Sequence, residues 1–265
     1  MGLSFLPFLE RIFENLTNIA LARAFLINLT TISCFLAFTF GLNNCFDIET
    51  DIAEGDLDKN PIAVGKISFK SALMVSLAAG FLGVTVLIFY IPTYTVIFIY
   101  LLLLFLGGFY SAPPLRFKSK PFLDVISHGL FFGSLLYIYG YLIQGANVWT
   151  VVKSPLVPLI FTYSVILNMR NHWEDYNFDL EANINTTATY LGHEITKRAI
   201  IFLIQIHWVM LLTLSLITDL HFFLEILTLF LISNVLFSLK LIKFEKWLRI
   251  IDIFTIISYI LSSLY

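Results

Sequence analysis

Long apolar runs separated by short polar segments are the feature that most limits how this chain can fold. Lipid cannot satisfy backbone N–H and C=O groups, so segments that cross a bilayer must be helices or strands of a closed barrel. Runs of nearly twenty residues without apolar/polar alternation favour helices. We therefore predict an all-α, polytopic membrane helical bundle whose eight spans lie at about 21–43, 69–90, 93–110, 122–143, 154–170, 198–218, 221–240 and 247–264.

The composition agrees with a membrane protein. Hydrophobic residues make up 58% of the chain and charged residues 13%, and the mean hydropathy is +0.87, outside the range of soluble globular domains. The formal net charge of −2 gives no sign of a nucleic-acid partner. We expect a protein integral to the cell membrane, with the lipid bilayer as its surroundings.

The distribution of basic residues predicts the orientation of the bundle. With eight spans, most Lys and Arg residues fall on one side: Lys59, Lys66, Lys70, Arg116, Lys118, Lys120, Arg170, Lys197, Arg198, Lys240, Lys243, Lys246 and Arg249. Loops rich in Lys and Arg stay in the cytoplasm. The cap loops near 44–68, 111–121 and 171–197 are therefore expected to face the cytoplasm.

Two segments share the pattern Asn-x3-Asp-x3-Asp, each directly after a predicted span. The first holds Asn43, Asp47 and Asp51, and the second holds Asn171, Asp175 and Asp179. Residues four apart lie on one face of a helix, so each segment is expected to form a polar ridge at a helix end. A lone aspartate there is typical of a solvated helix end, but the repeated triplet favours a functional site.

The chemistry of these side chains indicates a metal-bound anion. Four carboxylates close together are unfavourable unless a cation neutralises them, and ligands that are all oxygens suit Mg²⁺. Mg²⁺ is commonly held by a few carboxylates together with substrate phosphates. We expect Asp47, Asp51, Asp175 and Asp179 to hold Mg²⁺, with a diphosphate as the remaining ligand.

A basic segment, Tyr110-Ser-Ala-Pro-Pro-Leu-Arg-Phe-Lys118, lies between the two acidic motifs. Pro113 and Pro114 must end the preceding helix, and the extended chain after them could aim Arg116 and Lys118 at an anion. The alternative is that these two residues only anchor a cytoplasmic loop. The sequence leaves both interpretations open.

These three segments resemble the motifs of the UbiA-type intramembrane prenyltransferase superfamily, in order, spacing and membrane context. Residues 58–68 after the first acidic motif and 186–192 after the second extend the resemblance, which runs from about residue 21 to the C-terminus. It implies one prenyltransferase domain over 1–265 and magnesium-dependent transfer of a prenyl group from an isoprenyl diphosphate to a lipophilic acceptor. The segments 116–124 and 186–188 look most like the branch that contains lycopene elongases and archaeal homologues.

The resemblance also assigns roles to individual residues. It implies that the four aspartates are catalytic through their metal ions and that Asn43 and Asn171 orient ligands. Lys118, Arg116 and Lys59 would neutralise the charge of the leaving diphosphate. Tyr110 belongs to the site through the family's Tyr/basic loop. The motifs contact the diphosphate, so the acceptor class stays open among quinone precursors, chlorophyll-type acids, glycerol-phosphate lipids, haem and carotenoids.

Three departures from the family pattern stand out. Asn44 occupies a position that is commonly Asp, and Asn60 occupies one that is commonly Arg. Members usually have nine spans, whereas about twenty residues precede the first predicted span here, so the first helix is expected to be missing or truncated. Residues 1–20 could be a remnant of that helix, an interfacial segment or the product of a shortened reading frame.

Two other functions remain open at the level of sequence. A multi-span transporter or lipid-binding protein would carry charged or broken helices near the bilayer midplane. A non-catalytic family member lacking the first helix would keep the motifs without the activity.

Overall fold

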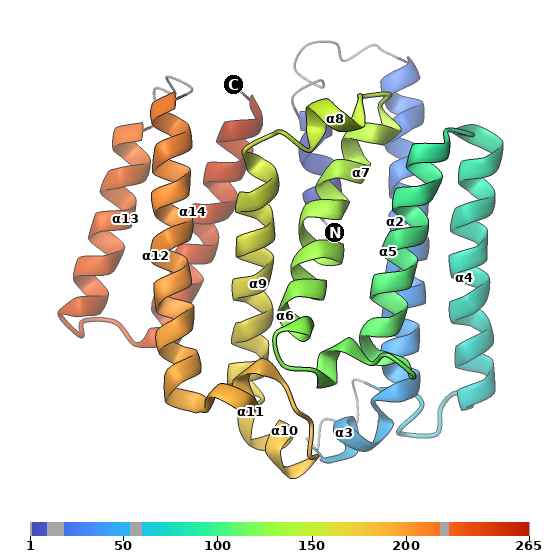
Figure 1. Cartoon of the computed structure of the whole chain (residues 1–265), viewed down its shortest axis with the longest axis horizontal. Helices are drawn as coiled ribbons and strands as arrows, with labels where there is room; N and C mark the ends of the chain where they lie inside the picture. Colours follow the sequence, from blue (N-terminus) through green and yellow to red (C-terminus); the bar gives the residue numbers. More distant parts are fainter. Residues whose placement is uncertain (1, 10–18, 54–59, 218–222, 265) are drawn as a thin grey trace.

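The computed structural model describes residues 2–9, 19–53, 60–217 and 223–264, and every regular element in these residues is a helix. Long helices stand side by side in a bundle (Figure 1). The all-α prediction is confirmed, and each of the eight predicted spans coincides with a helix or helix series: α2 (Ile19–Phe46), α4 (Phe69–Tyr90), α5 (Tyr94–Ser111), the series α6 (Leu123–His128), η4 (Gly129–Ser134) and α7 (Leu135–Ile143), α9 (Leu156–Glu174), α12 (His193–Ile217), α13 (Phe223–Ser238) and α14 (Phe244–Leu264).

The outer surfaces of these helices suit a bilayer. Among the described residues, five spans are long and apolar enough to cross a membrane: Ile19–Phe46, Phe69–Tyr90, Tyr94–Ser111, Leu123–Ile143 and His193–Ile217. On α4, Phe81 and Phe89 are 74% and 77% exposed. Large apolar side chains exposed along a whole helix are costly in water but favourable in lipid, so the prediction of an integral membrane protein is confirmed.

Small residues bring α2 and α4 close together. A Cβ atom added at Gly80 would meet the ring of Phe38 at 2.8 Å, and one added at Gly41 would meet the Ser76 hydroxyl at 2.0 Å. Membrane helices gain little from burying apolar surface against one another, so close approach through small residues is a main source of their packing energy. The α2–α4 pair therefore forms a firm support for the chain that follows α2.

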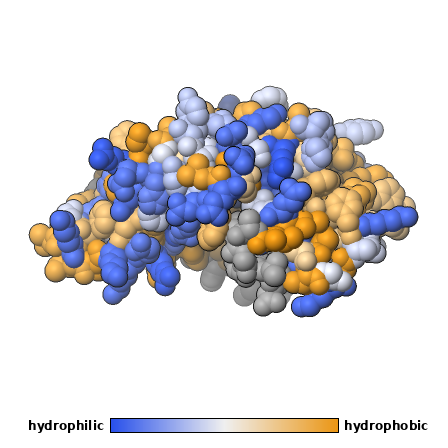
Figure 2. All heavy atoms as spheres, turned by 90° about the horizontal axis from the view of Figure 1, so that it is seen from below, coloured by the Kyte–Doolittle hydropathy of each residue, from blue (hydrophilic) through white to orange (hydrophobic). Residues whose placement is uncertain are grey.

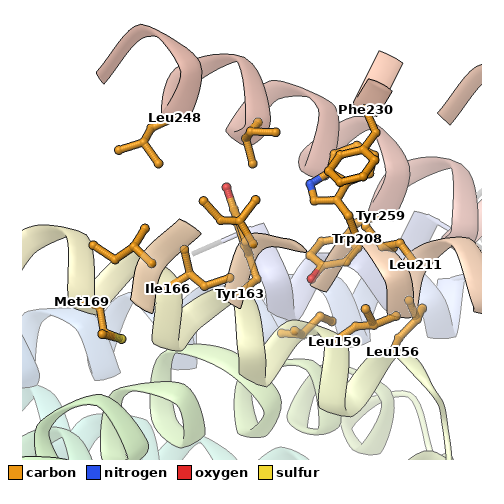
Figure 3. Close-up of a cluster of buried hydrophobic side chains, with 14 of the residues drawn as sticks. Leu156, Leu159, Tyr163, Ile166, Met169, Trp208, Leu211, Phe230, Leu248 and Tyr259 are labelled. Atoms are coloured by element: carbon orange, nitrogen blue, oxygen red, sulfur yellow. The ribbon is translucent and has the colours of Figure 1, made fainter. Parts of the chain in front are cut away.

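The other half of the bundle packs around aromatic residues from α9, α12, α13 and α14. Trp208 of α12 stacks on Phe230 of α13, with ring centroids 4.9 Å apart. Tyr163 of α9 lies among the side chains of this cluster (Figure 3). Near the C-terminal end of α9, Arg170 pairs with both oxygens of Asp252, at 2.7 and 2.8 Å, which ties α9 to α14.

Short elements close one end of the bundle. They are α3 (Ile48–Ala53), η3 (Phe117–Ser119), α10 (Tyr176–Glu181) and α11 (Thr187–Leu191). The first, third and fourth of these lie at the bottom of Figure 1, and we call this end the cap. Seen from below, hydrophilic side chains gather on the cap and hydrophobic ones appear at its edges (Figure 2). At the opposite end, the short helix α8 (Val148–Val151) joins α7 to α9.

Residues 2–9 pack inside the bundle. They form η1 (Gly2–Phe5) and a following helical turn, and η1 packs against α7 and α2. Ser4 is fully buried, and the Asn28 amide donates to its carbonyl and hydroxyl oxygens, each at 3.3 Å. The structure thus places residues 2–9 within the bundle, which is not the position of an interfacial segment. Glu10, Arg11, Glu14 and Asn15 lie outside the described residues.

Candidate active site

The first acidic segment crosses the junction between α2 and α3. The Asp47 N–H donates to the Asn43 carbonyl at 2.9 Å and the Asp51 N–H to the Asp47 carbonyl at 2.8 Å, so helical spacing continues through the junction. Asp47 is 4% exposed, and the Asn43 side-chain carbonyl accepts a 2.7 Å hydrogen bond from the Ser111 hydroxyl of α5. The segment thus ends a membrane helix and enters the cap.

The basic loop after α5 reaches this segment. Lys118 is 8% exposed and forms an ion pair with Asp47, and an Arg116 nitrogen lies 3.7 Å from the same carboxylate oxygen. Burial raises the pKa of the Asp47 carboxyl, and the positive charge of Lys118 opposes that shift. The loop thus places Arg116 and Lys118 beside Asp47, and their contact with a substrate anion stays a prediction.

Asn60 holds the other carboxylate of the first segment. Its amide nitrogen donates to Asp51 at 2.6 Å and to the Asn44 carbonyl at 2.9 Å, while its oxygen accepts from the N–H of Ile62 at 3.0 Å. Asn60 is fully buried. The residue that departs from the family pattern is therefore an organising part of the cap. Lys59, the neighbouring candidate for diphosphate binding, lies outside the described residues.

The second acidic segment crosses the junction between α9 and α10. Asp175 is the C-cap residue of helix α9, and the Asp179 N–H donates to the Asp175 carbonyl at 2.9 Å. Asp179 is 5% exposed and accepts a 3.2 Å hydrogen bond from the Thr186 hydroxyl. Because α10 packs against α3, the two acidic segments come together in the cap. Asn171 is exposed on α9.

A polar network on α9 was not predicted in full from the sequence. The Tyr110 hydroxyl donates to the side-chain oxygen of Asn168 at 3.0 Å and lies 3.3 Å from His172 Nε2. His172 Nδ1 lies 3.5 Å from an Asp179 oxygen. Asn168 is 3% exposed and stands four residues before His172, on the same helix face. Sequence reasoning singled out Tyr110 of this network, but it missed Asn168.

Asp124 is a second residue that sequence reasoning missed. It is fully buried at the start of α6 and accepts hydrogen bonds from the N–H and hydroxyl of Thr187, at 2.6 and 2.5 Å. One of its oxygens lies 3.8 Å from His172 Nε2. Asp124 therefore joins α6 to α11 and lies beside His172 of the polar network. An aspartate inside the predicted span 122–143 was the signal that could have found it.

The donor set suits a hard cation, although the described residues hold no ready-made group of three or more His, Cys, Asp or Glu that could bind a metal. The carboxylate and amide oxygens of the two segments lie on elements that pack together, α3 and α10, and Lys118 and Arg116 adjoin Asp47. Oxygen donors of this kind fit Mg²⁺ that shares its coordination with substrate phosphates. The arrangement places acidic and basic side chains together at the end of an apolar bundle.

Fold and site together define a polytopic helical membrane protein whose cap contains two acidic segments and a basic loop. The chain belongs to the UbiA prenyltransferase family, whose model matches residues 14–251. This confirms the resemblance stated from the motifs.

Curated relatives and solved structures agree with this assignment. A lycopene elongase/hydratase of Haloarcula japonica is 32% identical over 164 residues, which cover 60% of this chain and 51% of that protein. A 2-acylphloroglucinol 4-prenyltransferase of Humulus lupulus is 31% identical over 166 residues, which cover 60% of this chain and 39% of that protein. The matched region thus spans about half, or less, of these relatives.

The fold matches a UbiA homologue from Archaeoglobus fulgidus, solved with GPP and Mg²⁺ and with DMAPP and Mg²⁺. The two structures give TM-scores of 0.70 and 0.71 at 20% identity, and the match covers 99% of this chain and 95% of that one. At this level of identity the likeness concerns the fold.

Proposed function

We propose that this protein is a magnesium-dependent prenyltransferase that moves a prenyl group from an isoprenyl diphosphate to a lipophilic acceptor within the membrane. The observation that carries the proposal is the convergence of Lys118 and Arg116 on Asp47, in a cap where α3 packs against α10. Opposite charges are concentrated at the end of an apolar bundle, which suits a substrate with a charged head and a hydrocarbon tail. The whole chain, 1–265, would act as one domain.

Within this proposal the acidic segments hold the head of the donor. Asp47, Asp51, Asp175 and Asp179 would bind Mg²⁺, with Asn43 and Asn171 orienting ligands. The bound ions would offset the negative charge of the diphosphate and so make it a better leaving group. Lys118, Arg116 and Lys59 would contact the diphosphate oxygens, where charge grows as the C–O bond breaks.

The departure of diphosphate leaves an allylic carbocation that water must not reach. Next to the polar network, the ring of Tyr110 lies 5.3 Å from that of Phe131, which in turn lies 4.7 Å from that of Phe132. Phe131 is fully buried. Ring faces attract positive charge, and a dry aromatic environment prevents premature hydrolysis. We propose that this aromatic group adjoins the reacting carbon.

Two further parts of the proposal rest on less specific support. The positive-inside rule favours a cytoplasmic cap, because most Lys and Arg residues lie at that end. The match to lycopene elongases favours an apolar polyene acceptor, while the match to an acylphloroglucinol prenyltransferase supports an aromatic one. The acceptor assay should therefore offer both kinds of molecule.

The test is incubation of the purified protein with radiolabelled geranylgeranyl diphosphate, Mg²⁺ and membrane lipid extract, followed by identification of labelled lipids. Parallel reactions contain lycopene or an acylphloroglucinol. We expect label in a new lipophilic product, and only when Mg²⁺ is present. Absence of any product with every acceptor, despite bound donor, would instead support a non-catalytic family member.

A further inference from the structure

The α13–α14 hairpin joins a helix of 16 described residues to one of 21. The turn between α13 and α14 lies nearer the middle of the bundle than α3, α10 and α11 do (Figure 1). A turn that is set back from the cap in this way lies nearer the lipid headgroups than the cap elements do.

This turn is strongly basic. Four exposed basic side chains lie at its tip and on the first turns of α14, and we call them the basic turn: Lys240, Lys243, Lys246 and Arg249. The carboxylate in the same stretch is Glu245, also exposed. Leu239 and Leu241, on either side of Lys240, are 64% and 66% exposed. Such a surface combines positive charge with apolar flanks and fits an amphipathic, negatively charged partner.

The backbone of the turn keeps a lysine where glycine is usual. Lys240 has a φ of 57°, in the left-handed region that favours glycine or asparagine after a helix. Its N–H donates to the Phe237 carbonyl at 2.9 Å, and the next N–H, of Leu241, donates to the Leu236 carbonyl at 3.0 Å. An exposed ammonium is thus retained at the tip of the turn despite the backbone strain.

Aromatic packing gives the basic turn a rigid base. Phe237 stacks on Trp247 with ring centroids 4.6 Å apart, which joins the two helices directly behind the turn. Lys197 of α12 lies 4.9 Å from the Phe244 ring centroid and 5.9 Å from that of Trp173 on α9. These cation–π contacts extend the positive surface from α14 toward α12.

We propose that the basic turn binds the phosphate headgroups of anionic phospholipids in the leaflet on the cap side of the membrane. Headgroup phosphates are the negative charges present at that depth, and basic clusters beside membrane helices attract them. The exposed leucines would contact the acyl chains next to those headgroups. The site lies on the α13–α14 hairpin, whereas the acidic segments are on α2–α3 and α9–α10, so the proposal is independent of the prenyl-transfer chemistry.

The test uses the full chain in liposomes with spin-labelled phosphatidylglycerol or phosphatidylcholine, and measures the selectivity of the protein-associated lipid. The variant is K240Q/K243Q/K246Q. The matched control is K66Q/K70Q/K120Q, which removes three exposed lysines at the same end of the bundle. We expect the native chain and the control to prefer phosphatidylglycerol by at least about threefold and the variant to approach parity.

Equal selectivity in the variant and the native chain would overturn the proposal. Equal loss of selectivity in the variant and the control would also overturn it, because only a general effect of charge at this face would then remain. A second measurement needs no variant. The selectivity of the native chain should fall in high salt, because headgroup charges at a turn are screened. Selectivity that ignores salt would also contradict the proposal, whether or not the variant folds.

Discussion

The carboxylate of Asp47 is buried against the ammonium of Lys118, which joins the end of α2 to the loop that follows α5. The pair compensates the charge of Asp47 when no other cation is present. A donor diphosphate with its metal ions would offer each partner a new opposite charge in the same place. The ion pair therefore lies where charge must be exchanged during substrate binding.

Replacing Lys118 with Gln should impair donor use. The substitution removes a positive charge beside the leaving group and leaves Asp47 buried without its closest cation. We expect kcat/KM for the prenyl diphosphate to fall by about 100-fold, the size of a lost electrostatic contact to a transition state. The control is Lys120→Gln, which alters an exposed lysine two residues on. Similar kinetics in the two variants would show that Lys118 only anchors the loop.

Replacing Asp47 or Asp175 with Ala should abolish prenyl transfer and leave the bundle folded. Each aspartate lies at a helix junction in the cap, so its loss removes a proposed metal ligand without opening the apolar core. Product formation is measured with labelled donor, and helix content by circular dichroism. Glu194→Ala, an exposed carboxylate on α12, is the control. Full activity in either aspartate variant would rule out the metal–diphosphate model.

Asn60→Asp should destabilise the cap more than Asn60→Ala. Alanine removes the hydrogen bonds to Asp51 and to the turn, which costs about 1–3 kcal/mol for a buried group. Aspartate also places a second negative charge where Asn60 Nδ2 lies 2.6 Å from Asp51. The measurement is the midpoint of thermal unfolding in detergent. An Asn60→Asp protein as stable as the native chain would contradict the contact.

Thr187→Val should loosen the connection between α6 and α11. The Thr187 hydroxyl donates to Asp124 and accepts a 2.7 Å hydrogen bond from the Phe122 N–H, so valine removes two hydrogen bonds. The Asp124 carboxylate keeps those from the N–H groups of Val125 and Thr187. We expect a loss of about 1–3 kcal/mol in the free energy of unfolding. The control is Thr213→Val. Thr213 is exposed, and its hydroxyl donates to the Val209 carbonyl within the same helix, so this substitution should change little.

Much of the fold could be predicted from the sequence because apolar runs determine where helices cross a membrane. The expected 69–90 coincides with α4, and the expected 93–110 differs from α5 by one residue at each end. α9 continues past the predicted residue 170 to Glu174, because its polar last turn is stabilised by cap contacts rather than by lipid. Hydropathy alone does not contain that information.

The candidate site could be predicted in part. The repeated spacing identified the four aspartates, since a pattern within one segment is visible in the sequence. Asn168 and Asp124 were missed because their importance comes from contacts between distant segments, with Tyr110 and Thr187. Asn60 was noted only as a departure from the family pattern, whereas its hydrogen bond to Asp51 is a contact between separate segments that the sequence does not reveal.

Equilibrium binding of a non-reactive geranylgeranyl thiodiphosphate to the purified protein, with and without Mg²⁺, tests the proposed site most directly. One site built from both acidic segments predicts that binding requires Mg²⁺, is lost reversibly with a chelator, and is weakened at least about tenfold in both Asp47→Ala and Asp175→Ala. Tight binding without Mg²⁺, or binding that survives in either variant, would contradict the union of the two segments in one magnesium–diphosphate site.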